Sequence, residues 1–234
     1  MFSSVQSAFR SFTEQFEGCV TFMYLDVKGL VTVGIGNLVD PVGVAQALPF
    51  RFKDKGGIAT SGDPATADQI AAEWQRLKSN PDLGRKGYKA CEPLTDLELS
   101  DESIDALVLA RLSSNETFLK RQQWFQDFDS WPADAQLGLL SMAWAMGAGG
   151  PGQFPHFRTA CQSLDFDTAA AECKMNEAGN PGLIPRNRAN FALFSNASVV
   201  LADGDAGTFD RSVLYYPQTI KDASDGQAVP ASAD

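Results

Sequence analysis

The stretch FEGCVTFMYLDVKGLVTVGIGN, residues 16–37, contains the change of pattern on which the fold of this chain depends. Before it, apolar residues follow helical spacings of four, three and four: Val5, Phe9, Phe12 and Phe16. This spacing predicts a helix with one apolar face. Gly18 is expected to end that helix in the left-handed conformation, which puts Glu17 in its last turn.

Beyond Phe22 the apolar residues repeat with a period of two, which predicts two antiparallel strands and a tight turn. If the loop consists of residues 27–29, with Gly29 at positive φ, Tyr24 lies opposite Thr32. Asp26 is then diagonal to Thr32 on the same face of the hairpin. A two-residue loop would separate these side chains, so their meeting depends on the register.

Two carboxyl groups and a hydroxyl group near one another are suited to hydrolysis of a glycosidic bond. Glu17 lies where the negative end of the helix dipole favours the protonated acid, as a proton donor requires. Asp26, at the rim of a turn, is expected to stay ionised, and the Thr32 hydroxyl can hold an attacking water. Each residue also has an ordinary interpretation: a surface acid, a turn-capping aspartate and a strand threonine.

Composition excludes several other classes of function. The 234 residues include 44% hydrophobic and 21% charged side chains, as is usual for proteins that fold in water. The net charge of −10 disfavours binding to nucleic acid or to anionic membranes. No run of eighteen apolar residues occurs, and charged residues near the start argue against a cleavable signal peptide. A monomer is expected.

Metal and thiol chemistry find little support in the sequence. The chain has one histidine, His156, and four cysteines without a CxxC pair, so no zinc site and no cofactor are expected. Cys161 and Cys173 flank a predicted turn between helices. They could form a disulfide or remain buried thiols.

The remaining periodic segments are mainly helical. Helices are predicted at about 65–78, from Ser100 onward, at 157–164 and at 168–175. The segment SWPADAQLGLLSMAWAMG, from Ser130 to Gly147, is apolar nearly all round and is expected to be the buried central helix. Near the other end, IPRNRANFALF is expected to pack onto this bundle through Ile184, Phe191 and Phe194.

Two segments lack a clear period. Residues 41–66 are rich in Pro and Gly, which predicts an irregular insertion on the surface. The pattern also weakens from Ala197, although residues 213–216 (VLYY) are expected to anchor part of the tail. The final stretch, DASDGQAVPASAD, has the composition of a frayed end.

The spacing of the hairpin residues resembles that of the phage-type lysozymes. Eight residues separate Glu17 from Asp26, five more precede Thr32, and a Gly-x-Gly turn follows. The segments LSDESIDALVLARL and LLSMAWAMGAGGPGQF are similar to the long inter-lobe helix and the buried helix of that family, and IPRNRANFALF to its Asn-Arg segment. The resemblance implies an α+β, mainly helical lysozyme-like fold. Its small N-terminal lobe carries the hairpin, and a long helix joins it to a helical C-terminal lobe.

The resemblance also implies roles for individual residues. Glu17 would be the general acid, Asp26 the second carboxylate and Thr32 the residue that positions water. Arg188, with Arg186 as the alternative, would reach toward the acid from the C-terminal lobe. Three further residues are expected to bind substrate: Tyr24, Gly36 and Asn37.

The sequence departs from the family pattern in three places. Asn37 stands where the family often has histidine, the segment between Asn37 and Ser100 is longer than usual, and the tail is extra. We therefore expect a catalytic domain over 1–198 with an insertion at about 38–95. Residues 199–234 would form a C-terminal extension with a disordered end.

The function implied is that of a muramidase cutting the β-1,4 bond between N-acetylmuramic acid and N-acetylglucosamine in peptidoglycan glycan strands, with inversion. A lytic transglycosylase and a non-catalytic wall-binding module are the alternatives. Such a protein would act on the wall in the periplasm, as an endolysin delivered through a holin or as an antibacterial effector delivered by a secretion apparatus. An effector would imply an inhibitory immunity protein in the producing cell.

Overall fold

The computed structural model describes residues 1–54, 62–204 and 207–220. It is an α+β fold, mainly helical at 57% helix, with a small antiparallel sheet, which confirms the predicted fold class at this coarse level. The chain divides into two compact units. One comprises Thr13–Ala110 and holds the strands, and the other comprises Met1–Phe12 with Arg111–Asp234.

The first helix, α1 (Ser3–Glu17), begins in the second of these units and ends in the first. Val5, Phe9 and Phe12 are buried, which confirms the predicted apolar face. Gly18 has φ +68° and its N–H donates to the Glu14 carbonyl oxygen at 2.8 Å, so the predicted left-handed helix end is also confirmed.

A three-stranded antiparallel sheet follows, in the order β1 (Val20–Leu25), β2 (Val31–Gly34) and β3 (Asn37–Leu38). Tyr24 pairs with Thr32 and Leu25 with Val31. The Asp26 N–H donates to the Leu30 carbonyl oxygen at 2.9 Å, and Gly29 has φ +75°. The three-residue loop and the register that it implies are therefore confirmed.

The described residues of the segment 41–66 lie mostly at the surface, as predicted, but some of them are not irregular. They form α2 (Val42–Gln46) and β4 (Arg51–Phe52), which pairs with β5 (Leu97–Glu98) in a second, two-stranded sheet. Phe50, between α2 and β4, is buried. Proline and glycine here lie between short elements that pack against the rest of the unit. Such short elements contain too few residues to show a hydrophobic period in the sequence.

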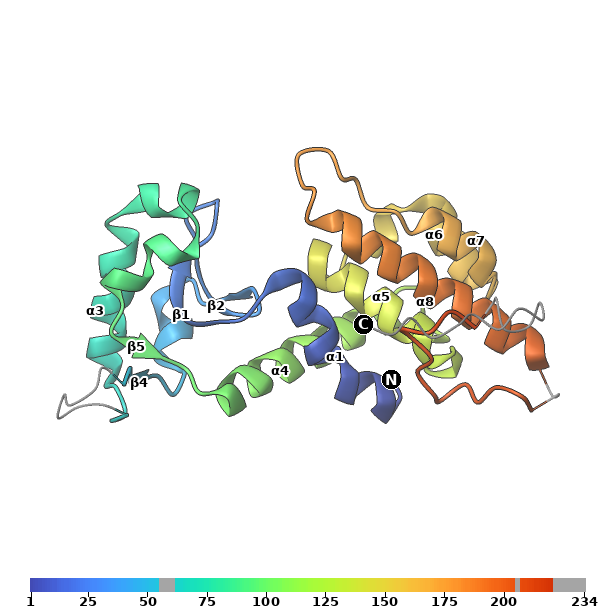
Figure 1. The fold of residues 1–234 in the computed structure, drawn as a ribbon, viewed down its shortest axis with the longest axis horizontal. Coiled ribbons are helices and arrows are strands. Elements are labelled where there is room, and N and C mark those ends of the chain that lie inside the picture. Colours follow the sequence, from blue (N-terminus) through green and yellow to red (C-terminus); the bar gives the residue numbers. More distant parts are fainter. Residues whose placement is uncertain (55–61, 205–206, 221–234) are drawn as a thin grey trace, which may run out of the picture. The chain divides into compact units, whose positions relative to one another are not determined.

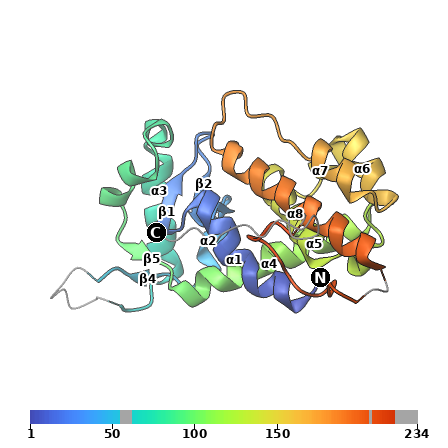
Figure 2. The same ribbon diagram turned by 45° about the vertical axis from the view of Figure 1, so that its right-hand side comes forward.

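The predicted helix at 65–78 is confirmed as α3 (Ala67–Lys78), with Thr66 and Gln69 forming a capping box at its start. It packs against α2 and against the first sheet, as Figures 1 and 2 show. Three short 3₁₀ helices then lead toward β5: η1 (Pro81–Arg85), η2 (Tyr88–Ala90) and η3 (Glu92–Leu94). Each of them contacts β1, so the insertion covers the strand that leads to Asp26.

The long helix α4 (Asp101–Lys120) begins directly after Ser100, as predicted, and continues from one unit into the other. The described part of the helical unit then continues with four α-helices and two 3₁₀ helices: η4 (Phe128–Ser130), α5 (Ala133–Met146), η5 (Pro151–Gln153), α6 (Pro155–Gln162), α7 (Phe166–Glu172) and α8 (Leu183–Asp203). The prediction of a buried central helix is confirmed, because every residue of α5 from Ala133 to Trp144 is buried.

Helices α5 and α8 lie side by side (Figures 1 and 2). A Cβ at Gly138 would lie 2.9 Å from the Phe194 ring, so α8 approaches α5 closely at this glycine. Phe194 is buried, as predicted, but Phe191 is 55% exposed and its predicted packing is wrong. The helical period explains the difference, because Arg188 and Phe191 share the outer side of α8 while Leu193 and Phe194 take the inner side.

The C-terminal segment packs more extensively than the sequence indicates. The hydrophobic pattern of the sequence weakens from Ala197, but helix α8 continues beyond that residue to Asp203 and buries Val200. The backbone N–H groups of Tyr215 and Tyr216 donate to Asp134 at 2.8 and 3.0 Å, which confirms the predicted anchoring at these two residues. Val213 is exposed, and the end predicted to fray lies outside the described residues.

Cys161 and Cys173 are buried free thiols, so the disulfide alternative is not realised. Burial raises the pKa of Cys161 well above its usual range and that of Cys173 to about 12. Both side chains therefore act as small apolar groups in the helical unit.

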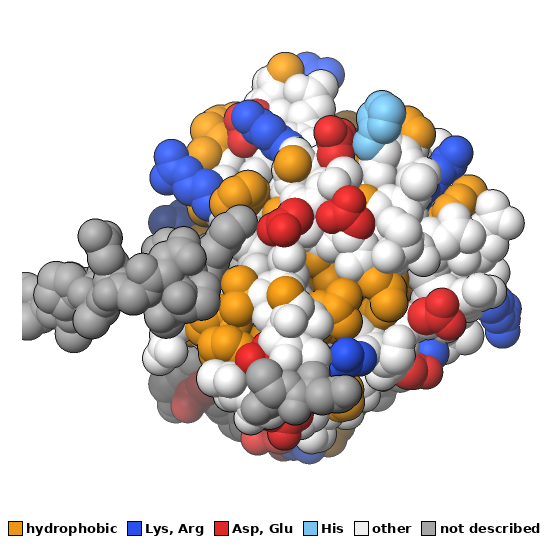
Figure 3. Space-filling view, turned by 90° about the vertical axis from the view of Figure 1, so that its right-hand side faces the viewer, with side chains coloured by type: hydrophobic (Ala, Val, Ile, Leu, Met, Phe, Trp, Pro, Cys, Tyr) orange, Lys and Arg blue, Asp and Glu red, His pale blue; other side chains and the backbone are white. Residues whose placement is uncertain are grey.

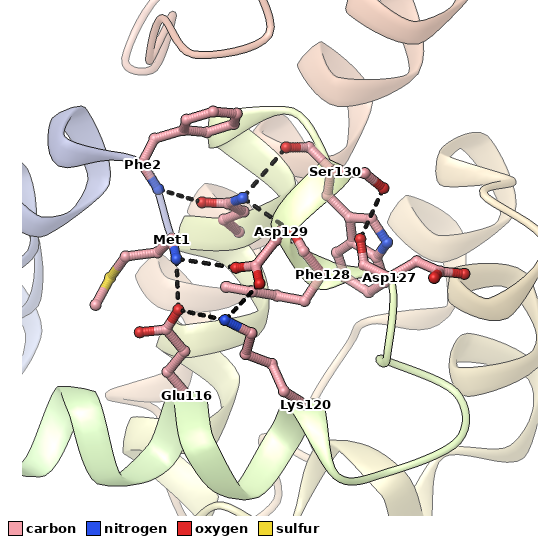
Figure 4. A network of polar contacts seen from close by, with 10 residues as sticks. Met1, Phe2, Glu116, Lys120, Asp127, Phe128, Asp129 and Ser130 are labelled. Atoms are coloured by element: carbon pink, nitrogen blue, oxygen red, sulfur yellow. Dashed lines mark hydrogen bonds and ion pairs between the residues drawn. The ribbon is translucent and has the colours of Figure 1, made fainter.

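A polar network joins the start of α1 to the end of α4 (Figure 4). The Met1 amino group contacts the carboxylates of Glu116 and Asp129, and Lys120 contacts the same two acids. Next to it, the Phe2 N–H donates to the Gln136 side chain at 2.8 Å. These contacts hold the first residues of the chain within the helical unit.

Candidate functional site

Tyr24 links three of the residues proposed for catalysis. It lies on β1 opposite Thr32, and two positions before Asp26 on the same face. Its pKa is raised to about 12, first by burial and then by the charges of Glu17 and Asp26, in that order. The register therefore brings Thr32 and Asp26 near Tyr24, and Glu17 is close enough for its charge to affect the same phenol. The phenol is neutral at physiological pH and can donate a hydrogen bond.

Asp26 closes the turn that carries it. Its Oδ1 accepts hydrogen bonds from the N–H groups of Lys28 at 2.8 Å and Leu30 at 2.9 Å. The turn-capping interpretation is thus realised, and it engages one of the two carboxylate oxygens. Oδ2 lies outside this pair of hydrogen bonds, so the same group can fix the loop and still act on a ligand.

Thr32 lies on β2, directly across from Tyr24, and its side chain is buried. Its hydroxyl donates to the Leu30 carbonyl oxygen at 3.4 Å, a long hydrogen bond. The hydroxyl oxygen keeps its capacity to accept. Leu30 thus bonds to both side chains: its N–H donates to Asp26, and its carbonyl oxygen accepts from Thr32.

Glu17 is the last residue of α1, and its side chain is exposed. Gly18 turns the chain directly into β1, which explains how a residue at a helix end can influence a strand tyrosine seven positions later. The exposure leaves the carboxyl group accessible to a large substrate. Because the side chain is exposed, the carboxyl group of Glu17 is also in contact with water at the end of α1.

Gly36 and Asn37 form the turn after β2 and the start of β3. Gly34 and Gly36 both have positive φ, near +70°, which few other residues adopt readily. Asn37 is buried, and its Oδ1 has no hydrogen-bond partner among the described residues. A buried amide oxygen without a partner is uncommon and is a candidate acceptor for a ligand or a water.

The hairpin is supported by residues of the insertion that sequence reasoning missed. A Cβ at Gly84 would lie 2.3 Å from the Asp26 carbonyl oxygen, so only glycine fits there without movement. Lys78 Nζ donates to the Gly29 carbonyl oxygen and contacts Asp40, both at 2.9 Å. These residues belong to no repeating pattern, and the sequence carries no signal that would identify them.

Arg188 and Arg186 occupy different environments on α8. Arg186 is buried and donates to the Ser141 carbonyl oxygen on α5 at 3.2 Å. Arg188 is exposed and lines a pocket of about 410 Å³ between α7 and α8, with Lys174, Glu177 and Phe191 among its other walls. Both arginines belong to the helical unit, and a role for either beside Glu17 stays a prediction.

Acidic, basic and apolar side chains are all present on the face shown in Figure 3, with apolar side chains exposed between the charged ones. Among the residues that the structure describes, no group of three or more His, Cys, Asp or Glu side chains is arranged to hold a metal ion. Within the same part of the chain, no helix is both long and apolar enough to span a membrane.

Comparison with known proteins adds no assignment, because neither a protein-family model nor a curated protein sequence matches the chain.

Proposed function

We propose that the protein is a muramidase that hydrolyses the β-1,4 bond between N-acetylmuramic acid and N-acetylglucosamine in peptidoglycan. One observation carries the proposal: the hairpin register pairs Tyr24 with Thr32 and places Asp26 two positions after Tyr24, and the charges of Glu17 and Asp26 contribute to the raised pKa of Tyr24. Glycosidases use two carboxyl groups beside the scissile bond. The confirmed register of the hairpin supports the same arrangement.

Each of the three residues then has a distinct chemical role. Glu17 donates a proton to the leaving oxygen, and its accessible side chain suits contact with a polymer. Asp26, fixed through Oδ1 by two backbone donors, accepts a proton at Oδ2 from the attacking water, and the Thr32 hydroxyl orients that water. Attack by water on the face opposite the leaving group inverts the anomeric centre.

The spacing of Glu17, Asp26 and Thr32, which resembles that of the phage-type lysozymes, supports hydrolysis over transglycosylation. A lytic transglycosylase of lysozyme-like fold generally works with the glutamate alone, whereas this chain has all three residues. The turn that carries Asp26 is also supported by other residues: Gly84 packs against the Asp26 carbonyl oxygen, and Lys78 donates to the Gly29 carbonyl oxygen. Such support favours a reaction in which the second carboxylate has a defined position.

The direct test replaces Glu17 by Gln, which removes the acid and keeps the shape. Glu17→Gln is expected to fold normally and to lose at least 100-fold in turnover on purified peptidoglycan, since general acid catalysis contributes about 10² to 10⁴. Glu102→Gln, the same change at an exposed position of α4, is the matched control and should retain wild-type activity.

Release of reducing sugar ends from peptidoglycan measures the turnover, and circular dichroism checks the fold. Full activity in Glu17→Gln would end the assignment. A wild-type protein that sediments with peptidoglycan without releasing any sugar would instead identify a wall-binding module.

A further inference from the structure

Tyr88 is the exposed end of an aromatic cluster that includes Tyr24. Its ring centroid lies 6.2 Å from that of Tyr24, in an edge-to-face arrangement, and 6.5 Å from that of Phe22. Tyr24 is the side chain on which Glu17 and Asp26 both act, whereas Tyr88 is 43% exposed. Aromatic side chains thus extend from Tyr24, on the hairpin, outward to solvent at Tyr88 within one compact unit.

The insertion holds Tyr88 in this position. Gly87, with φ +80°, turns the chain into η2, and the Cys91 N–H donates to the Tyr88 carbonyl oxygen at 2.9 Å. Cys91 is itself buried against β1, where its sulfur accepts from the Leu25 N–H at 3.4 Å. The backbone of Tyr88 is therefore fixed relative to the strand, while its ring stays partly open to water.

An exposed aromatic ring that packs on Tyr24 and has a fixed backbone is suited to one kind of ligand. The C–H groups on the face of a pyranose ring carry partial positive charge and pack against the negative face of an aromatic ring. The phenol hydroxyl can also exchange hydrogen bonds with sugar hydroxyl or acetamido groups.

We propose that Tyr88 binds a sugar ring of the glycan strand next to the bond that Glu17 and Asp26 cleave. The insertion thereby contributes directly to substrate binding as well as supporting the hairpin. Tyr88 contacts the substrate without taking part in proton transfer, so it sets affinity and position. This proposal rests on the proposed muramidase function.

The test compares Tyr88→Ala and Tyr88→Phe with the wild-type protein on purified peptidoglycan. Loss of one ring contact is expected to raise KM about tenfold while kcat changes less than about twofold. Tyr88→Phe should stay within about twofold of wild type, because the ring is retained. Phe118→Ala, which removes an aromatic ring of the same exposed fraction from α4 in the other unit, is the control and should leave both constants unchanged.

A second measurement separates this proposal from the proposed reaction. Cosedimentation with peptidoglycan is compared for Glu17→Gln and for the double variant Glu17→Gln with Tyr88→Ala; the double variant should bind about tenfold more weakly. Equal binding by the two proteins, or an unchanged KM in Tyr88→Ala, would overturn the role of Tyr88 and leave the muramidase assignment in place. Tyr88-dependent binding by a wild-type protein that releases no sugar would support the ring contact and overturn the reaction.

Discussion

At the scale of single residues, Asp26 both closes its own turn and keeps one carboxylate oxygen outside the hydrogen bonds of that turn. One oxygen closes the turn through two backbone donors, and the other lies outside that pair. The position of the carboxylate is therefore set by the backbone of its own loop. That backbone is in turn set by Gly84, which approaches the Asp26 carbonyl oxygen too closely for any Cβ.

Gly84→Ala is predicted to reduce catalysis with little effect on substrate affinity. The added methyl group would lie 2.3 Å from a backbone oxygen, so the turn with Asp26 must move. A displacement of about 1 Å can cost on the order of 100-fold in rate, so kcat should fall by at least about tenfold. Steady-state kinetics on peptidoglycan measure the change.

Gly43→Ala is the matched control for this substitution. Gly43 lies in α2, and a Cβ there would meet nothing within 4 Å. It should keep wild-type kcat. Equal kcat for Gly84→Ala and Gly43→Ala would contradict a functional role for the position of the Asp26 turn.

At the scale of elements, α3 is joined to β5 by a buried carboxyl group. Glu73 Oε2 accepts from the N–H groups of Asp96 at 2.6 Å and Leu97 at 3.1 Å, while Oε1 is buried with no partner among the described residues. Burial raises the pKa of Glu73 to about 7. Among the facing charges, that of Asp96 also raises the pKa and that of Lys53 lowers it.

This raised pKa predicts a stability that falls with increasing pH. The folded protein binds the Glu73 proton more tightly than the unfolded chain, whose pKa is about 4.5, so the stabilisation is fully present below about pH 4.5. It is lost as the pH rises through about 7, at a cost on the order of 3 kcal/mol. Glu73→Gln keeps the two hydrogen bonds and cannot ionise.

Chemical denaturation of the wild type and Glu73→Gln at pH 5 and pH 8 tests this prediction. From pH 5 to pH 8 the free energy of unfolding should fall more for the wild type than for Glu73→Gln, so the variant gains stability relative to the wild type. Glu92→Gln, an exposed acid of η3, should show no such shift. A pH-independent difference for Glu73→Gln would contradict the assignment of a buried, titrating carboxyl group.

At the scale of the whole molecule, the C-terminal segment belongs to the helical unit and is held by a buried acid. Asp134 on α5 accepts from Tyr215 and Tyr216, 81 and 82 positions later, and from Asn196 on α8 at 2.9 Å. Tyr216 also packs edge-to-face on Phe12, with ring centroids 5.5 Å apart. The described part of the extension beyond α8 is therefore anchored on the helical unit, mainly at Tyr215, Tyr216 and the buried Ile220.

Asp134→Ala is predicted to destabilise the protein by about 3 kcal/mol, because three donors lose a buried acceptor. Thermal or chemical denaturation measures the loss. Glu172→Ala, which removes an exposed acid of α7 in the same unit, should change stability by less than about 0.5 kcal/mol. A similar small effect in Asp134→Ala would show that the C-terminal segment contributes little to the fold.

The sequence predicts local features of this molecule better than contacts between distant residues. The end of α1 at Gly18, the register of Tyr24 with Thr32 and the burial of α5 follow from nearby periodicity and turn chemistry. The approach of Gly84 to Asp26 joins residues 58 positions apart. No periodic pattern carries such a contact, because it depends on how short 3₁₀ turns pack against β1.

Analysis by mass spectrometry of the muropeptides that the wild-type protein releases from peptidoglycan tests the central claim most directly. Hydrolysis by Glu17 and Asp26 predicts fragments that end in reducing N-acetylmuramic acid, and their absence with Glu17→Gln. Fragments ending in anhydro-muramic acid, or the same reducing fragments from Glu17→Gln, would contradict it.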